Sequence, residues 1–219
     1  MNNAGIMPTG LFIDEPSTMT DRIIDINLHG VINGSRLAIA RFVPHGRGTI
    51  VNVASLAGVA GFPALATYCA TKHAVLGFSE ALAGEMRAHG VAVTVVLPGV
   101  VRTELSAGAK LPRFMERVAT VDPEDVGQAI VAAVLSSKFR VTVPRRLGSM
   151  LSVMSMLPAP LRRAADRISG LDNAYVQADP ELRERYRLRL TEGSRLTEGS
   201  RLTEGSRLTE GSRLTEGSR

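Results

Sequence analysis

Tyr68 and Lys72 are four residues apart in the sequence Tyr-Cys-Ala-Thr-Lys, within a segment whose pattern predicts a helix. This spacing places the phenol and the ammonium one turn apart on the same helix face. A nearby positive charge favours the deprotonated form of a phenol, which suits a group that donates and accepts protons. Ser55 comes 13 residues before Tyr68, directly after a predicted strand. The three groups together could bind a carbonyl oxygen and supply its proton, which is half of a carbonyl reduction.

Asn27 is a polar residue among the apolar positions of an earlier predicted helix, between Ile24 and Val31. A buried amide must find hydrogen-bond partners, and a water held by its backbone or side chain would connect Lys72 to solvent. Each residue also has an ordinary structural interpretation: Asn27 as a satisfied core group, Ser55 as a cap, and Tyr-x-x-x-Lys as a chance pair on an exposed helix. Their order and spacing together favour a catalytic site.

The elements that must position these residues follow from the periodicity of apolar side chains. Thr18 with Asp21 predicts the capped start of the first helix, and Asp122-Pro123-Glu124-Asp125 predicts the start of the third. Residues 102–118 are mixed and predict a flap. Helices alternate with short β-branched strands, so we expect an α/β fold with a parallel sheet covered on both faces. The predicted helices are residues 20–42, 67–88 and 123–137, and the predicted strands are residues 49–54, 91–97 and 139–143.

A set of motifs, taken in order, resembles the short-chain dehydrogenase/reductase family. The set comprises Asn2-Asn3-Ala4-Gly5, Asn27, Ser55, Tyr68-x-x-x-Lys72 and Pro98-Gly99 followed by Thr103, and it covers residues 2–146 clearly and residues up to 188 more loosely. The resemblance implies the C-terminal part of a Rossmann-like doubly wound parallel sheet. It also implies an oxidoreductase that uses NAD or NADP, a small-molecule alcohol or carbonyl substrate, and a homo-oligomer paired through helices 20–42 and 67–88.

The same resemblance implies a role for each matched residue. Tyr68 would be the catalytic acid and base, Ser55 would orient the substrate oxygen, and Asn27 would hold a proton-relay water. Lys72 would contact the nicotinamide ribose and favour the phenolate of Tyr68. The residues implied for cofactor binding are Asn3, Ala4 and Gly5 on the adenosine side, Tyr68 and Lys72, and Pro98, Gly99, Val101 and Thr103 around the nicotinamide.

The chain departs from the family at its beginning. Members start with a strand and a Gly-rich turn that places the pyrophosphate against a helix N-terminus, and no Gly-x-x-x-Gly-x-Gly turn precedes Asn2. We expect roughly 80 to 90 residues, or three βα units, to be missing, through a misplaced start at Met1 or a real loss. The alternative to an oxidoreductase is therefore a catalytically inactive remnant or interaction module that cannot bind cofactor.

The amino-acid composition narrows the possible classes of protein further. With 44% hydrophobic and 21% charged residues over 219 residues, the chain is typical of a globular protein. A single cysteine, Cys69, excludes an intramolecular disulfide and any multi-cysteine metal site, and no metal site is predicted. The first residues lack the basic and apolar regions of a secretory signal, so we expect a cytoplasmic protein.

The net charge of +5 comes from one segment, because residues 138–167 carry seven basic side chains and one acidic side chain. With three Tyr and no Trp there is little aromatic surface on which bases could stack, so nucleic-acid binding is not expected. Within this segment, residues 147–161 are apolar and rich in Met. They could contact an anionic membrane surface or cover a lipophilic substrate. We favour a C-terminal extension that packs on the substrate cleft or a subunit interface.

The end of the chain repeats the hexapeptide Arg-Leu-Thr-Glu-Gly-Ser five times over residues 189–218. Leucine is the only strongly apolar residue in each copy, so a disordered tail without assigned function is expected. The predicted organisation is a catalytic Rossmann-like part at residues 1–146, an apolar and basic extension at 147–188, and a repeat tail at 189–219.

Overall fold

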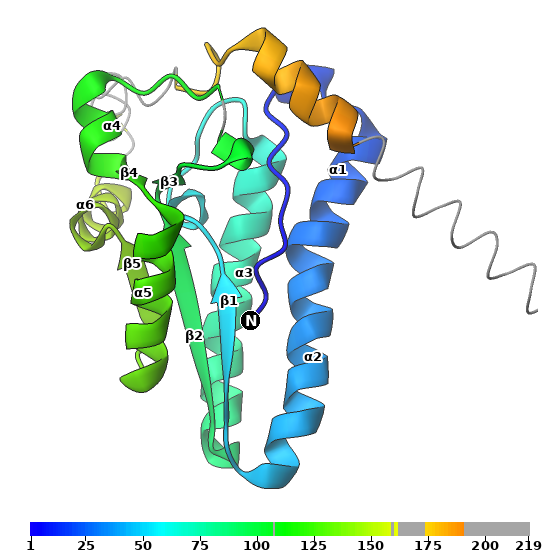
Figure 1. The fold of residues 1–219 in the computed structure, drawn as a ribbon, viewed down its shortest axis with the longest axis vertical. Helices are drawn as coiled ribbons and strands as arrows, with labels where there is room; N and C mark the ends of the chain where they lie inside the picture. Colours follow the sequence, from blue (N-terminus) through cyan, green and yellow to red (C-terminus); the bar gives the residue numbers. More distant parts are fainter. Residues whose placement is uncertain (107, 159, 162–173, 191–219) are drawn as a thin grey trace, which may run out of the picture. The chain divides into compact units, whose positions relative to one another are not determined.

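The computed structural model describes residues 1–106, 108–158, 160–161 and 174–190 (Figure 1). The chain divides into two compact units, Met1–Asp179 and Pro180–Arg219. In the second unit the described part is a helix at residues 180–190. From residue 191 onward the predicted repeat tail lies outside the described residues, as do the arginines at 162, 163 and 167. All that follows concerns the first unit unless stated.

The first unit is built on a parallel sheet in the order β1-β2-β5, which confirms the predicted α/β fold. Strand β1 is Gly48–Val53, β2 is Val91–Pro98 and β5 is Arg140–Val143. A second, two-stranded parallel pair joins β3 (Val100–Val101) to β4 (Thr120–Val121). Valine and isoleucine fill the central strands because both faces of the sheet are buried.

Alternate residues of β2 pack against helices on opposite faces of the sheet. Val93 belongs to a buried cluster with Leu82 of α3, whereas Val96 belongs to a cluster with Val126 and Ile130 of α5. This follows from the two-residue period of a strand. Figure 1 shows α2 and α3 on one side of the strands and α5 on the other. The bounds are α2 Gly30–Phe42, α3 Ala66–Met86 and α5 Pro123–Leu135.

The first predicted helix is interrupted by a π-helical segment. It consists of α1 (Ser17–Ile24), a wider turn at Asp25–His29, and then α2. The predicted cap at Thr18 is wrong, because the helix starts at Ser17 after Pro16 without a side-chain cap. The periodicity did not predict the wide turn, since one added residue barely disturbs an apolar spacing of three or four. Such turns are frequent at functional sites.

The predicted start of the third helix is confirmed. Asp122 and Asp125 form a capping box at the start of α5, with Pro123 in its first turn. In residues 102–118, predicted as an irregular flap, the structure has a 3₁₀ turn at Glu104–Ser106 and most of helix α4 (Arg113–Ala119). The other short 3₁₀ turns are Phe12–Asp14, Val43–His45, Leu56–Gly58 and Arg87–His89.

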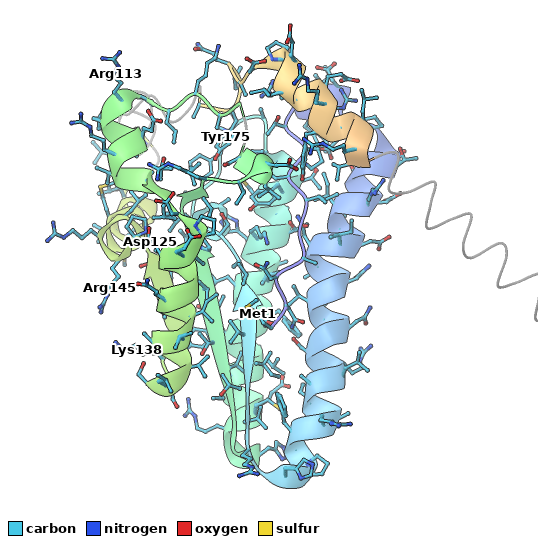
Figure 2. The ribbon with its side chains drawn as sticks, in the orientation of Figure 1. Met1, Arg113, Asp125, Lys138, Arg145 and Tyr175 are labelled. Atoms are coloured by element: carbon cyan, nitrogen blue, oxygen red, sulfur yellow. The ribbon has the colours of Figure 1, made fainter. Side chains whose placement is uncertain are left out.

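The extension after β5 begins with helix α6 (Arg145–Ser155). Leu147 is buried in the core with Leu97 and Met115, whereas Met150 and Val153 are exposed. Figure 2 shows the side chains of Lys138 and Arg145 pointing away from the sheet. Within the described residues, no helix has both the length and the apolar character needed to span a membrane.

Candidate active site

A cavity of about 470 Å³ opens at the carboxyl ends of the strands. Parallel strands bring their carboxyl ends to one edge, where loops of different chain segments meet. Ser55 and Gly99 enter the wall directly after β1 and β2. The described residues that line the cavity are Met1, Asn3, Gly5, Met7, Val53, Ala54, Ser55, Leu56, Ala57, Phe62, Leu65, Tyr68, Lys72, Pro98, Gly99, Val100, Val101, Thr103, Leu105, Ser106, Leu111, Met115, Ala119, Pro123, Val126, Gly127, Ile130, Leu147 and Tyr175.

The N-terminal segment runs along the free edge of β1 and presents alternate residues to the cavity. The backbone of Asn2 donates to Val51 O at 2.8 Å and accepts from the Val53 amide at 2.9 Å. Asn3 and Gly5 line the cavity, whereas Ala4 is not among the lining residues. Of the three residues predicted for the adenosine side, the structure therefore brings two to the cavity.

The side chain of Asn27 is fully buried and holds this N-terminal segment in place. Its Oδ1 accepts the Ile6 amide at 2.8 Å, and its Nδ2 donates to Ile6 O at 2.9 Å. The same Nδ2 lies 3.3 Å from Thr71 Oγ1 on α3. Asn27 is not among the cavity-lining residues, so its amide acts as a structural clamp between the N-terminal segment, the π-helical turn and α3.

Gly5 lies where Asn27 and Lys72 approach each other. A methyl group at position 5 would be 3.3 Å from Asn27 Oδ1 and 3.6 Å from Lys72 Nζ. Glycine therefore leaves the space between the two side chains open toward the cavity.

Ser55 caps the 3₁₀ turn Leu56–Gly58, and its Oγ accepts the Ala57 amide at 3.1 Å. Its side chain is also in the cavity wall, so the capping and the catalytic interpretations are compatible. A hydroxyl that accepts one hydrogen bond keeps its own proton to donate to a ligand. Gly58 at the end of this turn packs directly against the backbone of Lys72.

Tyr68 and Lys72 lie one turn apart on α3, and both side chains are buried in the cavity wall. Lys72 Nζ is 5.6 Å from the centroid of the Tyr68 ring and donates to Val53 O at 3.1 Å. Burial lowers the pKa of Lys72 from 10.5 to about 8. The Lys72 ammonium therefore changes protonation near the working pH of many enzymes.

The turn after β2 supplies the opposite wall. Pro98, Gly99, Val101 and Thr103 all line the cavity. Gly99 donates to Val143 O at 2.7 Å, and any side chain there would overlap the carbonyl of Ala119. Only glycine therefore lets this turn pass between the end of α4 and β5.

Sequence reasoning did not single out Tyr175, which completes the cavity wall. Its ring meets the ring of Phe62 edge to face, with centroids 6.1 Å apart. Ala174 O and Asp179 N bond the backbone of Lys110 and Gly108 at 2.9 and 3.0 Å. No local pattern could have indicated this return of the chain, because its partners lie far away in the sequence.

The residues present fit the reactive half of a nicotinamide cofactor. Lys72 carries three protons, and among the described residues the structure shows one acceptor for them, Val53 O. The remaining protons can be donated to hydroxyl oxygens of a bound ligand. No group of three or more His, Cys, Asp and Glu side chains in the described part of the chain is arranged to hold a metal ion.

Sequence and structure comparisons find known proteins that are similar to this chain. Residues 1–112 match the family model described as short chain dehydrogenase. The chain is 35% identical over 182 residues to the probable oxidoreductase EphD of Mycobacterium tuberculosis, covering 75% of this chain and 31% of that protein. It is 40% identical over 132 residues to the 3-alpha-(or 20-beta)-hydroxysteroid dehydrogenase of the same species, covering 60% of this chain and 51% of that protein.

A solved structure shares the fold. The short-chain dehydrogenase from Sphingobium yanoikuyae in complex with NADPH superimposes with a TM-score of 0.57 at 25% identity, covering 72% of this chain and 65% of that chain. The chain thus spans between about a third and two thirds of the length of these three proteins.

Proposed function

Because this chain belongs to the short-chain dehydrogenase family, we propose that it forms the catalytic part of an oxidoreductase that moves hydride between NAD or NADP and an alcohol or carbonyl substrate. One observation carries the proposal: Ser55, Tyr68 and Lys72 share the wall of a single cavity at the carboxyl edge of a parallel sheet. These side chains come from two elements, and their convergence supports a common task.

In carbonyl reduction, the Ser55 hydroxyl donates to the substrate oxygen and orients it. Tyr68 donates its phenolic proton to that same oxygen as it becomes an alcohol. The nearby Lys72 ammonium stabilises the phenolate that remains. In alcohol oxidation the same groups act in reverse. The nicotinamide ring, when bound, supplies or accepts the hydride.

Lys72 is suited to return the proton. Its pKa of about 8 lets the ammonium lose a proton to Tyr68 and regain one without a large energetic barrier near neutral pH. The Asn27 amide is occupied by Ile6 and Thr71. We therefore assign the proposed relay water to the backbone of the π-helical turn and give the side chain of Asn27 a positioning role.

For the cofactor, Lys72 would bond the nicotinamide ribose, and Pro98, Gly99, Val101 and Thr103 would border the nicotinamide. Asn3 and Gly5 would line the adenosine side. Ala4 would contribute through its backbone, since it is not among the lining residues. The NADPH in the related structure supports a nicotinamide cofactor.

The experiment compares wild type with Tyr68→Phe in assays that follow NADH or NADPH oxidation with a panel of ketones. We expect the variant to lose at least a hundredfold in kcat, because the acid is removed. Tyr186→Phe, on the helix at 180–190, is the matched control and should keep its activity. Equal rates for wild type and Tyr68→Phe would contradict the proposal.

A cofactor titration distinguishes the proposed oxidoreductase from the alternative, an inactive remnant or interaction module. Wild type that leaves NADH and NADPH fluorescence unchanged, and that oxidises neither, would favour this alternative.

We also propose that the protein forms a homo-oligomer through the helices predicted at 20–42 and 67–88, as the family resemblance implies. On α2, Leu37 is 75% exposed and is therefore accessible to a partner helix. Sedimentation velocity should show a dimer or larger species for wild type and a monomer for Leu37→Glu. A monomeric wild type would exclude the oligomer.

A further inference from the structure

Tyr175 is a buried polar residue in the cavity wall that the proposed mechanism leaves without a task. Its side chain lines the cavity, and the residue is only 7% exposed. Among the described residues the structure shows no hydrogen-bond partner for its hydroxyl. Figure 2 shows Tyr175 beyond the arrowheads of the strands, at the carboxyl end of the sheet.

The position of the Tyr175 ring is fixed by its neighbours. It packs edge to face on Phe62 at an interplanar angle of 74°. It also belongs to the same buried cluster as Tyr68, Met7 and Leu65. Tyr175 and Tyr68 therefore share one buried cluster, and both residues line the cavity.

The backbone around Tyr175 is held as firmly as its ring. The preceding carbonyl, Ala174 O, accepts the Lys110 amide at 2.9 Å, and the Asp179 amide donates to Gly108 O at 3.0 Å. Gly108 adopts a φ of 84°, which favours glycine. These bonds attach the segment to the loop that follows Thr103, so the hydroxyl has a defined place in the wall.

The Tyr175 hydroxyl is a hydrogen-bond donor at neutral pH. Burial raises its pKa to about 12, so the group stays protonated. It is consequently unsuited to proton transfer and suited to binding. Of the described side-chain atoms that are buried without a hydrogen-bond partner, none belongs to Tyr175, so its hydroxyl is open to the cavity, where a ligand can offer it an acceptor.

Much of the remaining cavity lining is apolar. The apolar lining residues include Leu105, Leu111, Met115 and Leu147. An apolar pocket with one or two convergent polar groups is typical of a small-molecule site in which those groups set orientation.

We propose that the Tyr175 hydroxyl donates a hydrogen bond to a second oxygen of the substrate. The substrate class is then an apolar alcohol or carbonyl compound that carries a further acceptor oxygen, such as an ether or ketone, apart from the reacting one. The identity of the reacting end rests on the proposed function above, whereas the recognition by Tyr175 is a binding property that can be measured without turnover.

The test uses three isosteric pairs of probes: the 2′-, 3′- and 4′-methoxyacetophenones and the corresponding ethylacetophenones. Their affinities for the 219-residue chain are measured by calorimetry or ligand-observed NMR. We expect at least one methoxy compound to bind about two- to tenfold more tightly than its ethyl partner, the effect of one hydrogen bond. Tyr175→Phe should remove this preference and leave the ethyl compounds unchanged. Equal affinities within every pair in wild type, or a preference that survives in Tyr175→Phe, would overturn the proposal.

Tyr175→Phe keeps the ring and its contact with Phe62, so the fold is retained. Tyr186→Phe is the matched control and should keep the preference. With cofactor present, the preference should appear as a lower KM for the methoxy ketone at similar kcat. Wild type that binds with the preference but never oxidises NAD(P)H would refute the redox function alone. Wild type that turns over both members of every pair with equal KM would refute the role of Tyr175 alone.

Discussion

Gly58 lies against the backbone of Lys72, so closely that a methyl group at position 58 would be 2.7 Å from the Lys72 carbonyl oxygen. This contact joins the turn that carries Ser55 to the helix that carries Tyr68 and Lys72. Because glycine has no side chain, these two segments of the active site can pack in direct backbone contact.

Gly58→Ala should therefore destabilise the protein and separate Ser55 from α3. We expect a loss of about 1 to 3 kcal/mol in the free energy of unfolding, because the overlap is with backbone that must move as a unit. Gly61→Ala is the matched control in the same loop, since no heavy atom lies within 4 Å of the added methyl group. Urea unfolding of both variants measures the difference, and equal stabilities would contradict the tight packing.

Because Lys72 is buried, replacing it with an uncharged residue should raise the free energy of unfolding, by an amount that depends on pH. Its pKa falls from 10.5 to about 8 on folding, so below about pH 8 both states are protonated and the folded state bears the full cost. Between pH 8 and 10.5 only the unfolded state binds the proton, so wild-type stability from this group rises with pH.

Lys72→Met should thus be more stable than wild type at pH 7 by about 2 to 3 kcal/mol, although inactive. The advantage should shrink as the pH approaches 10.5. Lys138→Met, at an exposed position, is the control for the loss of a surface charge. Unfolding curves at pH 7 and 10 test the prediction, and a gap that does not change with pH would count against it.

Replacing Asn27 by leucine should release the N-terminal segment. The amide and carbonyl of Ile6 would both lose their partners, at a cost of about 2 to 4 kcal/mol. Hydrogen exchange at the Ile6 amide should accelerate. Asn33→Leu on the exposed side of α2 should leave that amide protected, and similar protection of Ile6 in both variants would exclude the clamp.

The capping box of α5 predicts a smaller effect at the far wall of the cavity. Asp122→Ala removes the acceptor for the first turn and should cost about 1 kcal/mol. Arg102 also bonds Asp122 at 2.7 Å, but that pair is exposed to solvent. Arg102→Met should accordingly change the thermal midpoint of unfolding much less than Asp122→Ala. A larger change in Arg102→Met would instead show that the ion pair provides the stabilisation.

The sheet and its helices were predictable because each is encoded by a local period. The predicted strand 49–54 differs from β1 by one residue at each end, and the predicted strand 91–97 differs from β2 by one residue at its C-terminal end. By contrast, the π-helical turn at Asp25–His29 depends on where Asn27 finds its partners. Periodicity alone could not reveal it, since those partners belong to the N-terminal segment and α3.

For the site, the sequence by itself determined which residues could do chemistry: a serine after a strand, a tyrosine and lysine one helical turn apart, and a glycine turn after the next strand. The tertiary structure alone decided that Asn3 and Gly5, and not Ala4, line the cavity. The tertiary structure also placed Tyr175 in the same buried cluster as Tyr68. Spacing along one element is fixed by backbone geometry, whereas contacts between distant segments are fixed by how the whole chain buries its apolar surface.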